Sequence, residues 1–131
     1  MATEIDLWKW LKKSIPVYTN DLHLTRIENL AGVGVADVEG CLRGKQFWIE
    51  LKIASKPGGK VRFQKTQPPW HKRRLLAGGK TFVLVQAGQD RYLIPGEHIP
   101  SMEAGVDWSK LSVVDPKATC IDIIEKVGEG G

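Results

Sequence analysis

The stretch FWIELKIA, residues 47–54, places two charged side chains inside an otherwise apolar run. In a β-strand, successive side chains point to opposite faces, so Glu50 and Lys52 share one face. The apolar residues of the run, Phe47, Ile49, Leu51 and Ile53, share the other face. We therefore expect a strand with one core face and one face that carries two charges.

The preceding segment GVGVADVEGCLRGK, residues 32–45, predicts a partner strand that is joined to this one by a two-residue turn at Arg43-Gly44. In that register Leu42 pairs with Lys45, and counting outward from the turn puts Asp37 opposite Glu50. Their Cβ atoms would then be about 4.5–5.5 Å apart on the same face of the sheet. A three-residue turn would break this pairing, so the register is a definite prediction.

Two carboxylates at that distance repel each other unless a positive charge lies between them. A magnesium ion suits this position because it takes one or two protein carboxylates and fills its shell with water and phosphate oxygens. A lysine beside the metal can hold the attacking water or stabilise charge on the phosphate. The alternative is a structural ion pair in which Lys52 neutralises one carboxylate on a solvated face.

The remaining segments predict the order of the other elements. We expect helices over residues 3–15, 66–79 and 120–127, with Thr3 and Thr66 as caps and with Pro16 and Gly78-Gly79 as stops. Residues 22–29, 81–86 and 91–95 predict further strands. This order indicates an α/β domain with a central mixed sheet and helices on both faces.

Length and composition indicate one domain of 131 residues. We expect a core over about 3–94, a C-terminal extension over 95–127 and a disordered tail over 128–131. The net charge of +4 permits a nucleic-acid partner without being an argument for one. With neither a membrane-spanning run nor a leader, a cytoplasmic protein without a membrane partner is expected. Cys41 and Cys120, far apart in sequence, argue against a zinc site or a disulfide framework.

GVGVADV followed by FWIELK resembles the core motif of the PD-(D/E)xK nuclease superfamily. The segment VRFQKTQPPWHKRRLLAGGKTFVLV, residues 61–85, is similar to the continuation of that motif in virus- and phage-type replication and repair nucleases (VRR-NUC) and in Holliday-junction resolvases. The resemblance covers about residues 26–86 and implies an αβββαβ core. This chain departs from the family at Ala36, where proline is usual, but proline supplies no ligand there.

The resemblance implies a role for each matching residue. Asp37 and Glu50 correspond to the carboxylates that bind Mg²⁺, for which Mn²⁺ would substitute, and the backbone carbonyl of Leu51 to a further ligand. Lys52 corresponds to the catalytic lysine and Gln67 to the active-site glutamine. Such nucleases often add an acidic residue from the first helix. Glu4 is the first candidate and Glu28 the second, although a glutamate in a first helical turn also serves as a partner of the helix dipole.

Basic residues near these positions are candidates for DNA contacts, with solvated surface as the alternative. Four belong to a glycine-containing loop that we expect to be mobile, three to the helix after Gln67, and one lies near Asp37: Lys56, Lys60, Arg62, Lys65, Lys72, Arg73, Arg74 and Arg26. His71 is not assigned to the site, because its neighbours are basic and no second histidine is near.

The sequence thus predicts a magnesium-dependent DNA endonuclease. We favour a structure-selective, phage-type Holliday-junction resolvase, in the host cytoplasm if phage-encoded, because the short chain has no added module for reading a DNA sequence. Alternatives are a nicking or flap-type nuclease of the same superfamily, a non-catalytic DNA-binding module on this fold, and an unrelated small basic protein. Two cuts in opposed strands would require a homodimer. Tryptophans of the first helix and residues 94–114 could form its contact, or residues 94–114 could cover the sheet edge within one chain.

Overall fold

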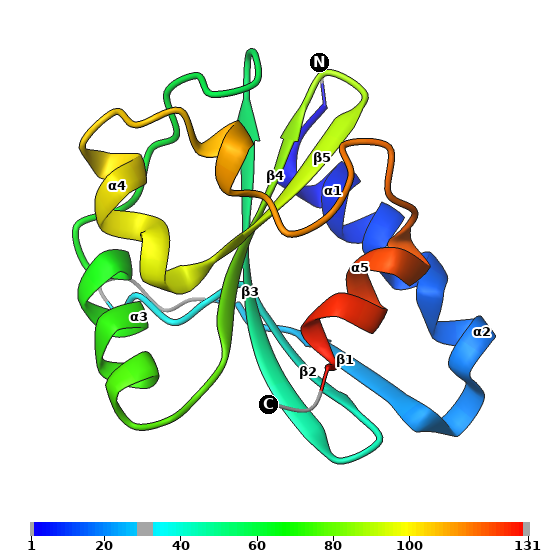
Figure 1. Cartoon of the computed structure of the whole chain (residues 1–131). Helices are drawn as coiled ribbons and strands as arrows, with labels where there is room; N and C mark the ends of the chain where they lie inside the picture. Colours follow the sequence, from blue (N-terminus) through cyan, green and yellow to red (C-terminus); the bar gives the residue numbers. More distant parts are fainter. Residues whose placement is uncertain (1, 29–32, 130–131) are drawn as a thin grey trace.

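A five-stranded mixed sheet forms the centre of the computed structural model, which describes residues 2–28 and 33–129 (Figure 1). Its strands lie in sequence order: β1 (Leu22–Arg26), β2 (Val38–Leu42), β3 (Lys45–Ala54), β4 (Thr81–Ala87) and β5 (Asp90–Pro95). β3 and β4 are parallel, whereas the other neighbouring pairs are antiparallel. A parallel pair needs a crossover connection, and α3 (Gln67–Leu76) provides it.

The hairpin of β2 and β3 has the predicted register. Leu42 pairs with Lys45 and Val38 with Ile49. The turn residues Arg43 and Gly44 have φ values of 48° and 86°, as a two-residue hairpin turn of type I′ requires. Asp37 immediately precedes β2, so that it continues this register toward Glu50.

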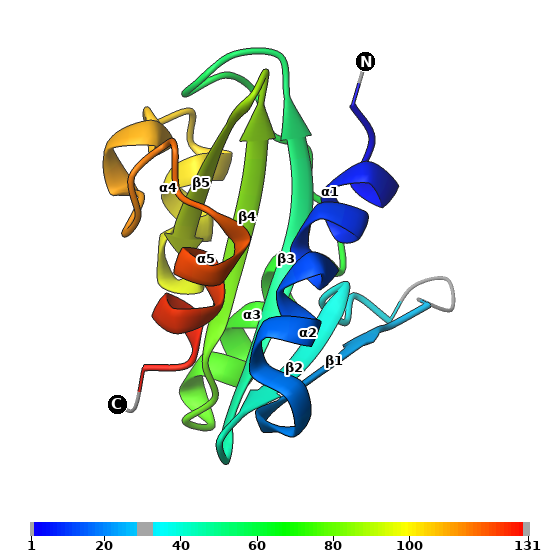
Figure 2. The ribbon, with the colours of Figure 1, turned by 90° about the vertical axis from the view of Figure 1, so that its right-hand side faces the viewer.

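Helices cover both faces of the sheet, which confirms the predicted α/β architecture (Figure 1). One face carries α1 (Glu4–Leu11), α2 (Ile15–Tyr18) and α5 (Cys120–Val127), and Figure 2 shows α1 and α5 in front of the strands with α3 behind them. The other face carries α3 and α4 (Ile99–Glu103). Four short 3₁₀ helices complete the order: η1 (Lys12–Ser14), η2 (Thr19–Asp21), η3 (Gly96–His98) and η4 (Trp108–Leu111).

The sheet separates two apolar layers. The layer under α1 and α5 includes Leu7, Leu11, Phe47, Ile49, Leu51, Ile123 and Ile124, all fully buried. The layer under α4 and η4 includes Val83, Val85, Ile94, Ile99 and Trp108. Glu50 and Lys52 pair with Val83 and Val85 of β4 and therefore face this second side. None of the helices in the described part of the chain is both long and apolar enough to cross a membrane.

The first and the last α-helix each begin with a capping box. Thr3 and Asp6 form a capping box at α1, and Thr119 and Asp122 form another at α5. The prediction that Pro16 ends the first helix is wrong. α1 ends at Leu11, and Pro16 lies in the first turn of α2, where its missing N–H has no intrahelical partner to lose.

The C-terminal part of the chain is built into the core. Ile123, Ile124 and Val127 of α5 are fully buried in the first layer. Residues 112–116 lie along the outer edge of β5, where the N–H of Val113 donates to the Leu93 carbonyl (2.8 Å). In the segment predicted as a tail, the N–H of Gly128 bonds to the Ile124 carbonyl and Lys80 bonds to the Glu129 carbonyl, while the disorder of residues 128–131 stays a prediction. Residues 130–131 lie outside the described part.

Candidate active site

A glycine lets the segment that leads to Asp37 pack against the start of α3. Gly34 has a φ of 76°, and a Cβ atom there would lie 2.2 Å from the carbonyl oxygen of Thr66. Only glycine therefore allows the segment before β2 to pack against Thr66, the N-cap residue of α3. Thr66 occupies the predicted cap position, but its side chain makes no capping hydrogen bond. The carbonyl group of Thr66 instead packs closely against Gly34.

Asp37 and Glu50 converge on one side of β3. The carboxylate of Asp37 accepts a hydrogen bond from the N–H of Leu51 at Oδ2 (2.8 Å). Glu50 is fully buried. Its pKa is raised, first by burial and then by the hydrogen bond to Asp37 and the negative charge of Asp37, while Lys52 acts in the opposite direction. The register prediction for this pair is thus confirmed.

Gln67 connects the charged residues. Its Nε2 donates to Glu50 Oε2 (3.0 Å), and its Oε1 accepts from Lys52 Nζ (2.9 Å) and from the N–H of Gln64 (2.8 Å). Gln67 is buried at the first position of α3. Its amide can therefore contact an acidic and a basic group at once, which a carboxylate or an ammonium group in this place could not do.

Sequence reasoning missed His71. Its ring is 1% exposed, and Nε2 lies 3.0 Å from Glu50 Oε1. Burial is the largest cause that lowers the pKa of His71, to about 4, so the imidazole is neutral near pH 7. A signal was available: His71 follows Gln67 by four residues, and residues at this spacing lie on the same side of a helix.

A cavity of about 420 Å³ opens beside these residues. Asp37, Lys52 and Gln67 line it together with Arg26 and with both acidic candidates, Glu4 and Glu28. The pKa of Glu4 is raised by partial burial and by the charge of Asp37, and lowered by Lys52 and Arg26. Both glutamates thus border the cavity, and Glu4 interacts electrostatically with its charged residues.

Two of the loop residues predicted to contact DNA lie next to this cavity. Lys60 and Arg62 line an adjoining hollow with Lys52 and Glu4. The predicted mobility of their loop is not supported. Trp108 Nε1 donates to the Gly59 carbonyl (2.7 Å), and the N–H of Gly59 bonds to Lys56. The basic loop is therefore attached to η4.

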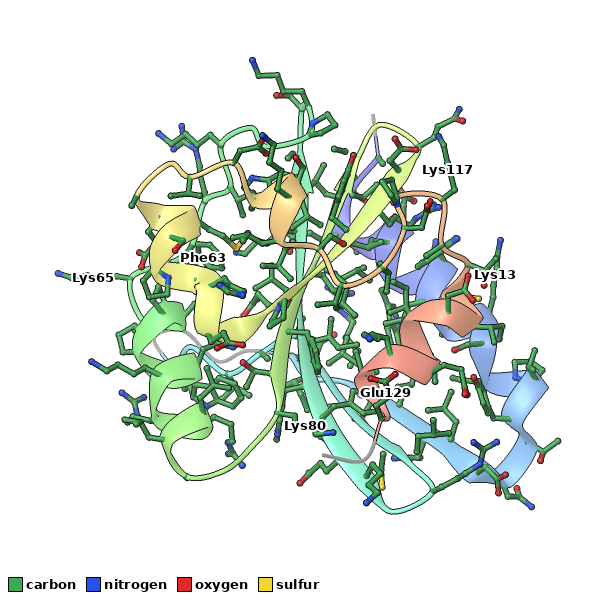
Figure 3. All side chains as sticks on the ribbon, viewed as in Figure 1. Lys13, Phe63, Lys65, Lys80, Lys117 and Glu129 are labelled. Atoms are coloured by element: carbon green, nitrogen blue, oxygen red, sulfur yellow. The ribbon has the colours of Figure 1, made fainter. Side chains whose placement is uncertain are left out.

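The other predicted DNA-binding residues lie farther from the cavity. Lys65 extends into solvent at the edge of the molecule, while Phe63 lies further in (Figure 3). None of the α3 residues Lys72, Arg73 and Arg74 lines the cavity. The guanidinium of Arg74 instead lies over Trp48 and Trp70, 5.0 and 5.3 Å from their ring centroids. α3 turns its Gln67–His71 side to the site, and the contact of these three residues with DNA stays a prediction.

The carboxylate pair suits a divalent cation. Glu50 is buried beside a second carboxylate, and the nearest ammonium group, that of Lys52, is bonded to Gln67. No group of three or more His, Cys, Asp or Glu side chains with metal-binding geometry occurs in residues 2–28 and 33–129. The donor set that remains is two carboxylates, of which that of Asp37 lines the cavity, and Mg²⁺ is bound by one or two carboxylates and water. The residues present therefore fit the ion that the motif implies.

Comparison with known proteins supports the fold. The sequence matches no protein-family model and no curated protein. The structure is similar to that of Hjc, a Holliday junction resolvase from the archaeal hyperthermophile Archaeoglobus fulgidus, with a TM-score of 0.51 and 8% sequence identity. The match covers 79% of this chain and 97% of Hjc. The chain therefore has the fold of the PD-(D/E)xK nucleases, the superfamily that its sequence motif resembles.

Proposed function

We propose that this protein is a metal-dependent endodeoxyribonuclease that cleaves branched DNA. The observation that carries the proposal is that Asp37, Lys52 and Gln67 line one cavity and that the buried Glu50 is hydrogen-bonded to Gln67. These residues come from β3, from α3 and from the segment before β2, in the order that the nuclease motif requires. The similarity to a Holliday junction resolvase makes junction DNA the first substrate to test.

Each residue of the candidate site would have its own role in the reaction. Asp37 and Glu50 would hold Mg²⁺ or Mn²⁺ together with the Leu51 carbonyl, and Glu4 or Glu28 would add a further oxygen through water. The ion would polarise the phosphate and lower the pKa of a bound water. Lys52 would stabilise the developing negative charge, because Gln67 holds its ammonium beside the carboxylates.

Gln67 and His71 would orient Glu50 instead of reacting. Each donates to a different oxygen of the Glu50 carboxylate when that group is ionised. Such contacts keep a metal ligand in one orientation, and their loss commonly lowers affinity or activity 10- to 100-fold, an order-of-magnitude expectation. Arg26, Lys60 and Arg62 would bind phosphates at the edge of the cavity, where they carry positive charge next to the scissile position.

The homodimer remains part of the proposal on geometric grounds. One domain with one carboxylate pair makes one cut, whereas a four-way junction needs two cuts related by a two-fold axis. Residues 94–114 do not supply an obvious contact, since Trp108 bonds to Gly59 and residues 112–116 cover β5 within the chain. The interface would have to lie elsewhere.

The decisive experiment compares DNA structures. Four-way junction, flap, single-stranded and linear duplex DNA are incubated with the protein in Mg²⁺ or Mn²⁺. We expect paired cuts in the junction and little cleavage of the linear duplex. A protein that binds DNA but cuts none of these substrates with either ion would be a non-catalytic DNA-binding module. Light scattering tests the dimer, and a monomer that nicks a single strand would be a nicking or flap-type nuclease.

A further inference from the structure

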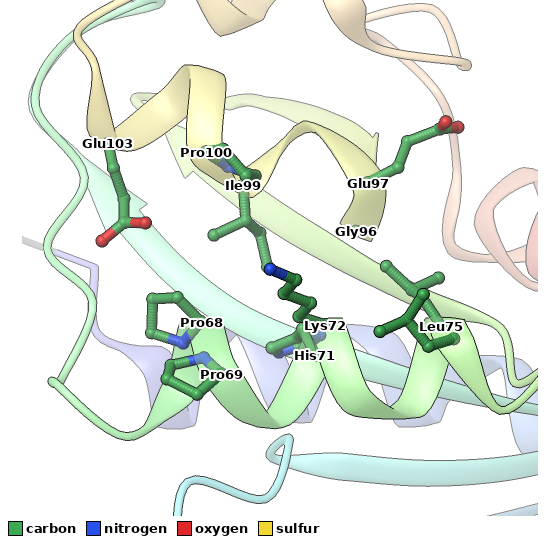
Figure 4. Close-up of a pocket in the computed structure, with 11 residues that line it drawn as sticks. Pro68, Pro69, His71, Lys72, Leu75, Gly96, Glu97, Ile99, Pro100 and Glu103 are labelled. Atoms are coloured by element: carbon green, nitrogen blue, oxygen red, sulfur yellow. The ribbon is translucent and has the colours of Figure 1, made fainter.

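α3 lies between two hollows of different character. A second cavity, of about 570 Å³, lies between α3 and the η3–α4 segment, and its mainly apolar walls include Leu75 and Ile99 (Figure 4). His71 lines this cavity as well as contacting Glu50. The hollow on the opposite side of the helix is smaller, about 220 Å³, and is lined by Trp70, Arg73, Arg74 and Ala77. That side of α3 therefore combines an indole ring with two guanidinium groups.

The indole and guanidinium groups continue the candidate site along two elements. Trp48 precedes Glu50 by two residues on β3, so the two side chains share one face of the strand, about 6–7 Å apart along it. Trp70 and Arg74 follow Gln67 by three and seven residues on α3, a spacing that keeps them on one side of the helix. The rings of Trp48 and Trp70 meet edge to face, with centroids 5.2 Å apart. Trp48, Trp70 and Arg74, here called the Trp–Arg patch, thus lie next to the buried Glu50 and Gln67.

Arg74 is held in place without an acidic partner. Its guanidinium lies over both rings of the patch, and its aliphatic part packs against Gly79, where a Cβ atom would lie 2.6 Å from Cδ. Within residues 2–28 and 33–129, no carboxylate forms an ion pair with Arg73 or Arg74. A guanidinium stacked on an aromatic ring still offers the N–H groups at its edge to a ligand. Trp48 and Arg74 are both partly exposed, so a ligand can reach them.

The chemistry of the patch indicates a nucleobase. A phosphate backbone is bound by positive charge, for which no aromatic ring is needed. Unpaired bases, in contrast, stack on aromatic rings and on guanidinium planes, whatever the sequence. DNA with a branch or a single-stranded arm presents such bases, whereas a linear duplex keeps them paired. A base is therefore the ligand that uses both components of the patch.

We propose that the Trp–Arg patch binds an unpaired base of the DNA close to the cleaved nucleotide. The base stacks on the exposed part of Trp48 and on the guanidinium of Arg74, and the exposed Arg73 contacts the adjoining phosphate. This inference rests on the proposed function for the presence of DNA. It adds the contact by which the protein distinguishes branched DNA from linear duplex.

The test combines changes in the DNA with changes in the protein. A flap and a four-way junction are prepared with an abasic site at each nucleotide around the branch point in turn, which removes one base and keeps every phosphate. Affinities are measured by fluorescence anisotropy in EDTA, so that no divalent cation supports cleavage. We expect one or two abasic positions to weaken binding by the wild-type protein about 5- to 150-fold, the range that corresponds to the loss of one stacked base.

Four variants locate the base. Trp48→Leu and Arg74→Gln should weaken binding of the intact DNA, and the abasic sites should then have little further effect, because the partner of the base is already gone. Trp48→Phe keeps an aromatic ring and should retain part of the abasic effect. Arg91→Gln is the matched control, since it breaks a contact between the Arg91 guanidinium and the Trp10 ring (3.9 Å) on the other face of the sheet. It should bind as the wild type does, and circular dichroism establishes that all four variants are folded.

Three results would overturn the proposal. The first is a wild-type protein that binds no branched DNA or binds it equally well with every abasic site. The second is an abasic effect of the same size in the wild type, Trp48→Leu and Arg74→Gln, which would place the base on other residues. The third is an equal loss in Arg91→Gln. Cleavage is measured separately with Mg²⁺ or Mn²⁺: base-dependent binding without any cleavage would refute the nuclease proposal alone, and cleavage without base dependence would refute this inference alone.

Discussion

The middle of β3 is buried on both faces, but the side chains that surround it are apolar on one face and polar on the other. On one face, Phe47, Ile49 and Leu51 are fully buried in the apolar layer under α1 and α5. On the other face, Glu50 is fully buried and Lys52 nearly so, yet their partners are polar: Gln67, and for Glu50 also His71. Burial alone thus does not distinguish core from site. The chemistry of the neighbours does.

The two faces also differ in their effect on stability. Apolar burial stabilises the fold, whereas a buried charge is costly unless hydrogen bonds and opposite charge compensate it. Each Glu50 oxygen has a partner, but Asp37 adds a second negative charge. We conclude that one face of the strand supplies stability and the other retains an unfavourable arrangement for function.

The largest effect should follow from a change on the polar face. Glu50→Gln should lower metal-dependent cleavage about 10³-fold, the scale seen when one group that stabilises a transition state is lost. The free energy of unfolding should stay the same or rise, because the repulsion with Asp37 disappears. Cleavage assays and urea denaturation measure the two quantities. Glu39→Gln on β2, outside the cavity, is the matched control. Wild-type cleavage by the Glu50 variant would refute its assignment as a metal ligand.

A change on the apolar face should lower the stability of the protein and leave its cleavage activity intact. Ile49→Ala removes a fully buried side chain and should lower the free energy of unfolding by about 2–5 kcal/mol. Ile49→Val should cost only about 0.5–1.5 kcal/mol. Cleavage per folded molecule should be retained in both, as measured below the unfolding transition. Full stability with lost cleavage in Ile49→Ala would mean that the two faces do not divide these roles.

Divalent cations should offset the loss of stability that the two neighbouring carboxylates of the polar face cause. Mg²⁺ at ten times its dissociation constant should stabilise the folded protein by about 1.4 kcal/mol, because it binds only the folded state. Thermal melts with Mg²⁺, and with NaCl at the same ionic strength, measure this difference. Asp37→Asn should be insensitive to Mg²⁺. An equal shift in that variant would place the binding of the ion elsewhere.

The smallest effect should come from the rim of the polar face. Replacing Lys60 and Arg62 with glutamine should weaken binding several-fold for every DNA sequence. The slope of log affinity against log salt should flatten by up to about 2, since each phosphate contact contributes about 0.9. Lys12→Gln with Lys13→Gln, which removes equal charge beyond α1, is the control (Lys13 is labelled in Figure 3). A slope unchanged in the first variant would assign those cations to solvated surface.

Local patterns allowed much of this arrangement to be predicted. The alternation in β3 and the Arg43-Gly44 turn placed Asp37 opposite Glu50, because a turn of known length determines the register of a hairpin. Gln67 followed from the resemblance to the nuclease motif. His71 was missed although its helical spacing from Gln67 was visible, since basic neighbours argued against it.

Other features required contacts between distant parts of the chain. Trp108 holds Gly59 across 49 residues, so a loop that reads as mobile in sequence is attached to η4. Glu4 comes to the cavity because α1 packs on β3. Neither contact leaves a pattern in the sequence near the residues concerned.

By itself, the sequence determined the strand with two unlike faces, its partner strand, and the carboxylates and lysine that they share. These depend on residue alternation and turn length, which act over a few positions. Only the tertiary structure decided which helix covers the charges, that His71 joins Glu50 to a second cavity, and that residues 112–116 protect β5. Packing brings residues together by shape and burial, and these have no period along the chain.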